Sequence, residues 1–292
     1  MPEYRLNDAA FLFAYEYSNM LTKRLIACFD IIDGRVTKAV RFQDNIDVAP
    51  AEEMAEALYH AHIDELIFYD ITASAEKRSI DINTVKRVAS RVFIPFTVGG
   101  GIKTLNDMYA VLKAGAEKVS VDSMAVRNPQ IIAEGAKAFG SQCIVLSTQV
   151  KRTPAMPSGY EVYIDGARQA TGMDAMEWIK RGQELGAGEI CLNSIDNDGT
   201  LSGYDLELMA LAEKTVSVPL ITSGGAGLPE HLSALFIQTD AQAAIISSML
   251  YSPRMERNYT VKELKEYLIQ KNINMRTLQL SPLTSPGDVN VV

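Results

Sequence analysis

The sequence is poor in the residues that build metal centres and disulfide frameworks. Its 292 residues include three cysteines, Cys28, Cys143 and Cys191, each inside an apolar run and none in a CxxC pair. This pattern argues against a zinc site and indicates buried free thiols in a reducing compartment. The three histidines fall in helix-like stretches, so histidine catalysis is not favoured. We predict no metal site and no cofactor.

Long hydrophobic runs and clusters of positive charge are also missing. The longest uninterrupted apolar runs fall well short of the roughly 20 residues that span a bilayer. The N-terminus carries acidic residues within its apolar patch and lacks the cationic start of a signal peptide. The net charge is −8, and no basic stripe suggests nucleic acid. We therefore expect a cytoplasmic protein with neither a membrane nor a nucleic-acid partner.

What the sequence does contain is a repeated alternation of two patterns. Eight apolar, β-branched runs recur, at residues 25–30, 65–70, 94–98, 118–122, 143–149, 189–194, 219–223 and 243–247. They are continuous, as is typical of parallel strands buried on both faces. Helical stretches lie between most of them, one opening at Pro50 and others closing at Gly115 and Gly186. This predicts an α/β fold, a (βα)8 or TIM barrel, with an open doubly wound sheet as the alternative.

The chain also repeats itself at one constant spacing. Three pairs of residues in matching motifs lie 124 positions apart: Glu65 and Glu189, Gly100 and Gly224, and Ser123 and Ser247. One offset across three separate motifs indicates two similar half-barrels. The first strands of the two halves then align at an offset of 119, which pairs Asp30 with Gln149. One half carries a carboxylate where the other carries an amide.

In a barrel of this kind the functional site lies at the C-terminal ends of the strands. Two glycine turns there, "GGG" at 99–101 and "SGG" at 223–225, each come just before a helix. Glycine lets backbone N–H groups point at an oxyanion, so two symmetric turns predict two phosphate sites and a bisphosphate substrate. The alternative is that these glycines only make tight turns. The predicted substrate-binding residues are Lys38, Asp70, Gly100, Gly101, Asp122, Ser123, Asn193, Asp198, Gly199, Ser223, Gly224, Gly225, Ser247 and Ser248.

Asp30 ends the first strand and is the predicted general acid or base, because burial can tune the pKa of a carboxyl at the barrel mouth. A structural aspartate that accepts from loop N–H groups is the alternative. Asp70 fits a turn or helix cap equally well. Asp33 and the following glycine read as a turn. Lys38 is expected in a polar loop that closes over phosphate, and otherwise is a solvated lysine.

Six segments together carry a family resemblance. "KRLIACFDIIDGRVTKAVRF", "IDELIFYDITAS", "IPFTVGGGI", "GAEKVSV", "SIDNDGTLSGYD" and "SGGAG" resemble the cyclase subunit of imidazole glycerol phosphate synthase, from about Met20 to Arg276. "DITAS" and "SIDNDGT" set them apart from the related phosphoribosyl isomerase. The resemblance implies a lyase of histidine biosynthesis that receives ammonia from a separate glutaminase. With that ammonia it splits a bisphosphorylated ribonucleotide-type substrate into imidazole glycerol phosphate and an aminoimidazole carboxamide ribonucleotide.

The resemblance also implies an ammonia gate at the opposite, N-terminal face of the barrel. The matching positions are Arg24, Glu65, Lys118 and Glu189, and all four charged residues are present. They predict a neutral, salt-bridged ring and a glutaminase partner that docks there to form a heterodimer. Ordinary ion pairs at the bottom of the barrel are the alternative.

Four positions depart from the pattern of the family. The two catalytic carboxylates match Asp30 and Gln149, so the second is an amide, which cannot act as a general acid or base. An asparagine is replaced by Asp122, a threonine by Asn193, and a small alanine by Ser247. Asp122 is the candidate to supply the acid lost at position 149.

These departures leave two alternatives to the interpretation of the chain as a cyclase. One is a paralogue that channels ammonia to another substrate, such as a surface sugar undergoing acetamidino modification; the other is an inactive scaffold for a glutaminase. The resemblance also divides the chain. It predicts an extension or misassigned start at 1–19, the barrel at 20–276, and a loose Pro- and Ser-rich tail at 277–292.

Overall fold

The computed structural model describes residues 21–40, 43–72, 80–252 and 255–276, with only the backbone of 38–40 and 43–46. The predicted extension at 1–19 and tail at 277–292 lie outside these residues. None of the helices described is long and apolar enough to cross a membrane.

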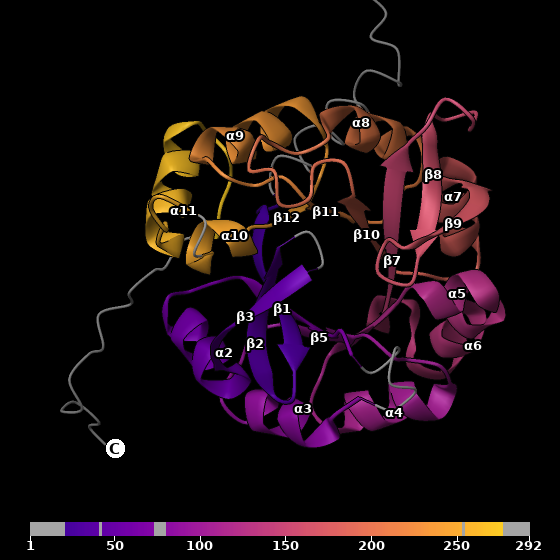
Figure 1. Ribbon diagram of the computed structural model, residues 1–292, viewed down its shortest axis with the longest axis horizontal. Helices are drawn as coiled ribbons and strands as arrows, with labels where there is room; N and C mark the ends of the chain where they lie inside the picture. Colours follow the sequence, from indigo (N-terminus) through magenta and orange to yellow (C-terminus); the bar gives the residue numbers. More distant parts are fainter. Residues whose placement is uncertain (1–20, 41–42, 73–79, 253–254, 277–292) are drawn as a thin grey trace, which may run out of the picture.

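Eight parallel strands close into a barrel (Figure 1). In order they are β1 (Arg24–Ile32), β4 (Glu65–Asp70), β5 (Phe96–Gly99), β6 (Lys118–Val121), β7 (Ile144–Arg152), β10 (Glu189–Ser194), β11 (Leu220–Ser223) and β12 (Ala243–Ile245). Each pairs with the next, β7 with β10, and β12 pairs back onto β1. All eight predicted strands and the (βα)8 barrel are confirmed.

Helices surround the strands in a ring (Figure 1). The longer ones are α2 (Ala51–His60), α3 (Ile82–Ala89), α4 (Leu105–Lys113), α6 (Gln130–Phe139), α7 (Ala175–Glu184), α8 (Leu206–Thr215), α9 (Pro229–Gln238) and α11 (Val261–Gln270). Short segments are α5 (Ser123–Arg127), η1 (Ser141–Cys143) and α10 (Ser247–Tyr251). The predicted start at Pro50 and the stops at Gly115 and Gly186 are confirmed, both glycines having the positive φ that ends a helix.

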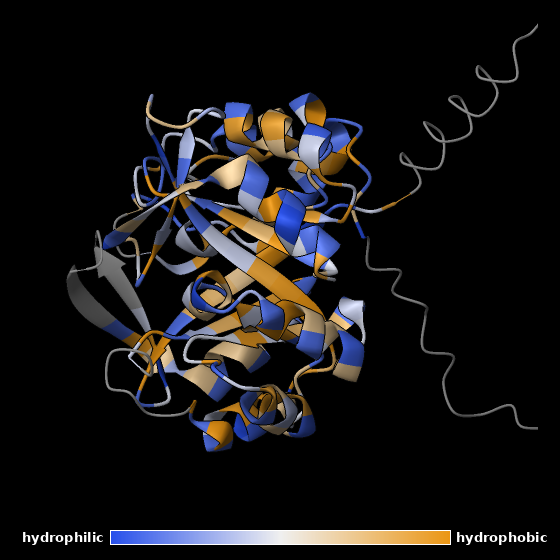
Figure 2. Cartoon of the chain, turned by 90° about the vertical axis from the view of Figure 1, so that its right-hand side faces the viewer, coloured by the Kyte–Doolittle hydropathy of each residue, from blue (hydrophilic) through white to orange (hydrophobic). Residues whose placement is uncertain are grey.

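The core has two layers because both faces of each strand are covered. Seven side chains fill the barrel interior: Ile26, Ile67, Val145, Cys191, Ile221, Ala243 and Ile245. A larger cluster packs between the outer faces of the strands and the helices, with Trp178 and Phe96 among its largest buried members. In the side view the strand that runs diagonally through the middle of the molecule is apolar over part of its length (Figure 2). Burial on both faces explains why the sequences of the barrel strands lack polar alternation.

Each half-barrel opens with a hairpin that extends its first strand. β2 (Arg35–Val40) and β3 (Gln43–Pro50) follow β1, and β8 (Tyr160–Ile164) and β9 (Gln169–Asp174) follow β7. The predicted turn at Asp33 is confirmed, with φ 48° there and 75° at the next residue. The polar loop expected around Lys38 is wrong, because its backbone pairs within β2. The side chain of Lys38 lies outside the described residues.

Strand register confirms that Asp30 and Gln149 are equivalent positions. Asp30 pairs with Tyr69 on β4, and Gln149 pairs with Asn193 on β10. The two partners are themselves 124 positions apart, the spacing of the sequence repeat. Both residues point into the barrel, because every second residue of a strand faces the same side.

Candidate active site

A cavity of about 740 Å³ opens at the C-terminal ends of the strands, and all eight strand ends contribute to it. Most of the predicted site residues line it: Asp30, Asp70, Gly100, Gly101, Asp122, Ser123, Gln149, Asn193, Asp198, Ser223, Gly224, Gly225, Ser247 and Ser248. Gly199 is not among the lining residues; it lies in the turn that follows β10, with φ 70°. A single concave site at this end is where a (βα)8 barrel carries its chemistry.

The two glycine turns have the same geometry. Gly100 has φ 83°, and a Cβ there would lie 2.3 Å from the carbonyl oxygen of Asp70. Gly224 has φ 93°, and a Cβ there would lie 2.8 Å from the carbonyl oxygen of Ser194. Both turns therefore require glycine for its backbone conformation and for its close contact with the preceding strand. Both halves contribute such a turn to the cavity wall.

The two equivalent serines are engaged differently. The Ser123 hydroxyl oxygen accepts a hydrogen bond from the Asp165 N–H at 3.0 Å. The Ser247 hydroxyl accepts from the Cys28 N–H and donates to the Cys28 carbonyl, both at 2.8 Å. The side chain of Ser247 therefore ties α10 to β1, and its neighbour Ser248 also lines the cavity.

Asp30 and Gln149 lie half-buried at the mouth on the first strands of the two halves. The Asp30 carbonyl accepts from the Thr37 hydroxyl at 3.2 Å, which anchors the end of β1 to its hairpin. The Gln149 Oε1 is shielded from solvent and finds no hydrogen-bond partner among the described residues. A shielded acceptor in a cavity wall is suited to receive a hydrogen bond from a ligand.

Asp122 follows β6 and precedes α5 in the wall beside the first glycine turn. Burial raises the pKa of Asp122 above its ordinary value, and the Asp165 carboxylate acts in the same direction. The Ser123 hydroxyl and the Arg127 guanidinium oppose that shift without cancelling it. Asp122 therefore holds a proton more readily than an exposed aspartate does.

Four charged residues of the cavity wall were missed by the sequence reading: Lys103, Arg127, Asp165 and Arg168. Arg127 forms an ion pair of 2.5 Å with Asp165, and the Arg168 Nε–H donates to the Asp165 carbonyl at 2.7 Å. Asp165 and Gly166 form the turn between β8 and β9, both with positive φ. An Asp-Gly pair between alternating apolar residues is a hairpin signal, so "YEVYIDGAR" contained the information needed to find this turn.

Below the mouth, polar side chains occupy the barrel interior. The Tyr69 hydroxyl lies 3.2 Å from both the Ser120 and the Ser147 hydroxyl oxygens. Burial raises the pKa of Tyr69 well above its ordinary value, and it raises that of Cys191 to about 12. Both groups therefore remain protonated and uncharged near neutral pH.

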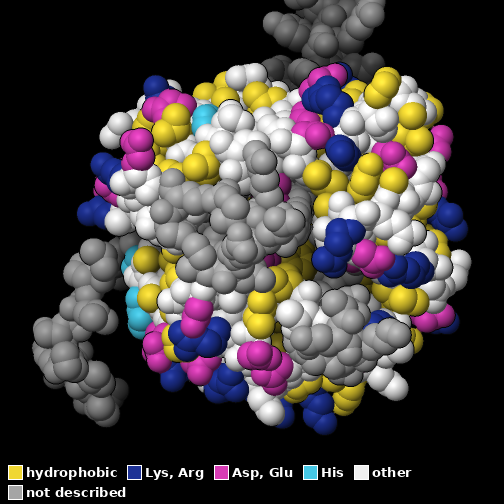
Figure 3. All heavy atoms as spheres, in the orientation of Figure 1, with side chains coloured by type: hydrophobic (Ala, Val, Ile, Leu, Met, Phe, Trp, Pro, Cys, Tyr) yellow, Lys and Arg dark blue, Asp and Glu magenta, His cyan; other side chains and the backbone are white. Residues whose placement is uncertain are grey.

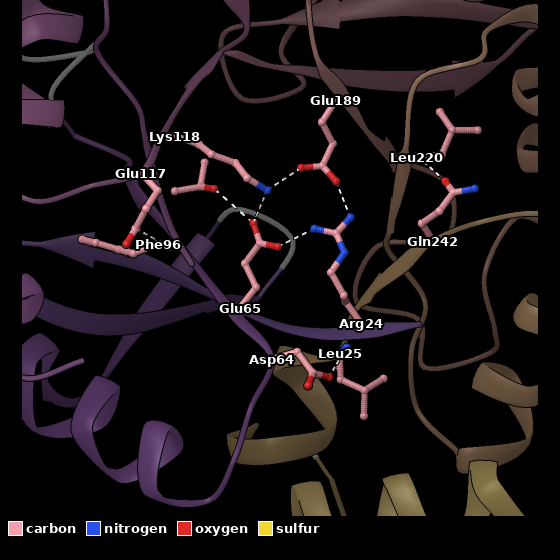
Figure 4. A network of polar contacts seen from close by, with 11 residues as sticks. Arg24, Leu25, Asp64, Glu65, Phe96, Glu117, Lys118, Glu189, Leu220 and Gln242 are labelled. Carbon is pink, nitrogen blue, oxygen red and sulfur yellow. Dashed lines mark hydrogen bonds and ion pairs between the residues drawn. The ribbon is translucent and has the colours of Figure 1, made fainter. Parts of the chain in front are cut away.

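At the N-terminal face, the four predicted gate residues form a closed charged ring, drawn in Figure 4. Arg24 contacts Glu65 at 2.5 Å and also Glu189, while Lys118 contacts Glu65 at 2.9 Å and Glu189 at 2.7 Å. Burial acts to lower the pKa of Arg24, but Glu189 and Glu65 outweigh it and raise the pKa. Burial likewise acts to raise the pKa of Glu189, but Arg24 and Lys118 lower it. The ring pairs two basic residues with two acidic ones, so its formal charges cancel.

Charges at the mouth are mixed. On the face that carries the β8–β9 hairpin, positive and negative side chains alternate without gathering into one patch (Figure 3). The cavity wall repeats this mixture, because Lys103, Arg127 and Arg168 share it with five aspartates of the strand ends and turns. Recognition of an anion there depends on groups within the cavity and not on the overall field.

Comparison with known proteins decides the family. A family described as "Histidine biosynthesis protein" matches residues 24–256. "Imidazole glycerol phosphate synthase subunit HisF" of Desulfatibacillum aliphaticivorans is 51% identical over 260 residues, 88% of this chain and 98% of the relative. The protein of the same name from Desulforapulum autotrophicum is 52% identical over 260 residues, 88% of this chain and 99% of the relative. The chain belongs to the HisF family of imidazole glycerol phosphate synthase subunits.

The matched region of this HisF-family chain contains every barrel strand and the whole cavity wall. A third relative, from Solidesulfovibrio magneticus, is 48% identical over 262 residues, 89% of this chain and its own full length. The four departures at Asp122, Gln149, Asn193 and Ser247 all lie inside the matched region and line the cavity. The structure thus places all four positions in one site on the HisF-family barrel.

Proposed function

We propose that this HisF-family protein is an ammonia-dependent cyclase acting on a bisphosphorylated ribonucleotide-type substrate. The products would be imidazole glycerol phosphate and an aminoimidazole carboxamide ribonucleotide. One observation carries the proposal: two symmetric glycine turns face each other across a cavity of about 740 Å³ whose wall includes Asp30. A substrate with a phosphate at each end fits that arrangement, and its reacting centre would then lie between the turns.

The two phosphate positions would bind by different means. Gly100, Gly101 and Ser123 would hold one phosphate, with Lys103 and Arg127 in the same wall to offset its charge. Gly224, Gly225 and Ser248, together with Ser223 and Asp198, would hold the other, where no lysine or arginine of the described residues lines the wall. The second phosphate would therefore depend mainly on N–H and O–H donors. Asn193 and Asp70 complete the wall and would contact the sugar-phosphate chain.

Asp30 is the acid or base we assign to the reaction. A nitrogen nucleophile that displaces a leaving group must lose a proton, and the leaving group must gain one. One ionised group that accepts a proton and one protonated group that donates a proton would serve both steps, and we assign these roles to Asp30 and a partner carboxyl. Gln149 cannot be that partner, because an amide does not titrate in this range. It can instead donate and accept hydrogen bonds to the substrate through its amide.

A glutaminase docked on the N-terminal face would supply the ammonia through the ring of Arg24, Glu65, Lys118 and Glu189. Large apolar side chains surround that face and support docking. Leu21, Phe93, Ile237 and Ile269 are 42–80% exposed, and each lies next to a strand start or at the end of an outer helix. Exposed apolar groups around a charged opening are typical of a protein interface.

Turnover by the purified full-length chain tests the activity. We expect consumption of the cyclase substrate with ammonium chloride as the nitrogen source, and loss of that turnover in Asp30→Asn. Absence of turnover above background, both with ammonium and with an added glutaminase, would refute the cyclase assignment.

Docking is tested separately from chemistry. Phe93→Asp places a charge in the apolar rim, so it should abolish glutamine-dependent turnover with a glutaminase while ammonium-dependent turnover persists. Tyr109→Asp is the control, because Tyr109 is also an exposed aromatic residue, at 55% against 80% for Phe93, but lies on α4, on the outer side of the barrel. Equal behaviour of the two variants would contradict docking at the N-terminal face.

A second candidate is amination of a different substrate by the same barrel. The amide at position 149 favours it, because it replaces a titratable group at the mouth. The two candidates differ in the phosphate groups they need. The second candidate is favoured if this protein aminates a nucleotide sugar, and if the bisphosphate competitively inhibits that amination without being turned over. Binding of a glutaminase without either activity would indicate a scaffold.

A further inference from the structure

Asp122 is an unusual aspartate for its place at the start of a helix. Three other aspartates in that position, Asp81, Asp174 and Asp205, each accept a hydrogen bond from an N–H of their own helix. Asp122 precedes α5 but makes no capping hydrogen bond to it. Asp122 is one of the residues that line the cavity. Capping, the usual structural role of such an aspartate, therefore does not explain it.

A short chain of contacts connects Asp122 to the turn between β8 and β9. The hydroxyl of Ser123 influences the Asp122 carboxyl by hydrogen bonding, and its oxygen accepts the N–H of Asp165 at 3.0 Å. The Asp165 carboxylate in turn contacts Arg127 at 2.5 Å. Arg127 lies at the end of α5, so its charge is shared between two carboxyls, Asp122 and Asp165.

We propose that the Arg127–Asp165 ion pair sets the protonation state of Asp122, and that Asp122 is the proton-carrying partner of Asp30. Arg127 and Asp165 are then positioning residues that act through Asp122. The Asp165 carboxylate lies 2.5 Å from the Arg127 guanidinium. It thereby limits how strongly that guanidinium stabilises the Asp122 carboxylate. The role of Asp122 in turnover rests on the proposed function, whereas the effect of the pair on its protonation does not.

The proton balance needs no further reactant. Asp122 gives its proton to the departing group, and its carboxylate then recovers one from solvent or from the incoming nitrogen. The carboxyl thus carries a proton in each turnover without net change. This is the acid function that Gln149, at the mouth on β7, cannot supply.

Other charged groups also share the cavity with Asp122. Lys103 follows the first glycine turn, Arg168 belongs to the β8–β9 turn, and Asp70 and Asp30 end neighbouring strands. Of the charged neighbours, Asp165 and Arg127 have the resolved influence on the Asp122 carboxyl, and these two act in opposite directions. Substitution of each member of the pair should therefore produce opposite effects.

Three variants test the pair. Arg127→Met removes a positive charge and keeps the aliphatic stem, so the pKa of Asp122 should rise and the loss of activity at high pH should move to higher pH. Asp165→Asn frees Arg127 to act on Asp122, so the pKa of Asp122 should fall and the loss of activity at high pH should move to lower pH. Asparagine tolerates the positive φ of position 165, and the N–H bond to Ser123 is kept. Asp122→Asn should lower kcat at least about 100-fold.

A surface ion pair serves as the matched control. Arg91 and Glu56 contact at 2.8 Å with exposures of 42% and 41%, close to the 45% and 32% of Arg127 and Asp165. Arg91→Met and Glu56→Gln should leave the pH profile unchanged. Arg127→Lys should restore the wild-type profile at least in part, because it restores the charge.

Carbon-13 NMR of labelled aspartate carboxyls, with Asp122 assigned from Asp122→Asn, follows the same titration without substrate. Opposite pH shifts in Arg127→Met and Asp165→Asn are the expected result. Shifts in one direction, or none, would overturn the proposal. If the cyclase substrate is never turned over, the proposed function fails, but the NMR titrations still decide whether the pair controls Asp122.

Discussion

The two half-barrels build one helix start with the same geometry and different chemistry. In the first half, the Asp107 carboxylate accepts from the N–H groups of Lys103 and Thr104, at 3.0 and 2.8 Å. In the second, the His231 Nδ1 accepts from the N–H groups of Gly227 and Leu228, at 3.3 and 3.2 Å. Donors and acceptors alike are 124 positions apart. The backbone conformation of the helix start is thus the same in both halves, but the side chain that accepts its two N–H hydrogen bonds is different.

The mouth follows the same rule. The glycine turns, whose backbone conformation only glycine adopts easily, are kept in both halves. The groups that carry charge differ: Asp30 corresponds to Gln149, and Lys103 corresponds to Gly227. The backbone of the mouth is therefore symmetric, whereas the charged side chains that line it are not.

The largest expected effect contrasts Asp30 with its counterpart. Asp30→Asn should lower ammonia-dependent kcat by about 10²- to 10⁴-fold, the usual contribution of a general acid or base. Gln149→Asp should change kcat far less if Asp122 already carries the second proton. Steady-state kinetics at saturating ammonium would measure both. Rescue of Asp122→Asn by Gln149→Asp would mean that the two positions are interchangeable, whereas equal losses at 30 and 149 would contradict the asymmetry.

The charged ring should give the next largest effect, on stability. Glu65 is fully buried and accepts from Thr97 as well as from two cations, whereas among the described residues Glu189 has the two cations as its partners. Glu65→Gln should lower the free energy of unfolding by about 3–5 kcal/mol, because it leaves buried cations short of a partner. Glu189→Gln should cost less.

Urea unfolding would measure this difference. The exposed pair gives the reference, since Glu56→Gln should cost under about 1 kcal/mol. A ring variant no worse than Glu56→Gln would show that water enters and solvates the ring.

The glycine turns should differ by a smaller amount. Gly100→Ala brings a Cβ to 2.3 Å from a backbone oxygen, and Gly224→Ala to 2.8 Å, so the first should be more destabilising. We expect costs of about 1–3 kcal/mol for the strain, with weaker inhibition by inorganic phosphate. Gly159→Ala is the control, because it has a similar φ of 82° but open space around it. If it costs as much as Gly100→Ala, then conformation and not contact decides.

The smallest expected effect is a pH dependence of stability at the helix start that contains His231, compared with the one that contains Asp107. Burial lowers the pKa of His231 below 6.5, so the folded state binds its proton less readily than the unfolded state. Stability is therefore full above the unfolded pKa and declines as pH falls through about 6.5 towards the folded pKa. Protonation also removes the acceptor at Nδ1.

Hydrogen exchange at single amides would detect this opening. Between about pH 7.5 and about pH 5.5, protection at Gly227 and Leu228 should fall relative to Lys103 and Thr104, after correction for intrinsic rates. In His231→Asn the pH dependence at Gly227 and Leu228 should disappear. A parallel change at both helix starts would locate the pH effect elsewhere in the barrel.

Much of the fold could be predicted because local patterns decide it. Apolar runs bounded by helix stops specify strands buried on both faces, and a constant offset reveals the repeat. The hairpin of the first half was missed because β2 contains charged residues typical of a polar loop, whereas the alternating β8 and its Asp-Gly turn did carry a hairpin signal. Pairing with a neighbouring strand overrides the composition of such segments.

The sequence by itself determined the barrel, the two-fold repeat, the glycine turns and the amide at position 149. These depend on spacing and on backbone conformation, which neighbouring residues largely control. Only the tertiary structure decided that Arg127 meets Asp165, that Ser247 is committed to Cys28, and that Asp122 caps nothing. The two contacts join a helix to a turn and a helix to a strand that lie apart in the sequence. Their charges and burial therefore depend on closure of the barrel, which no local pattern reports.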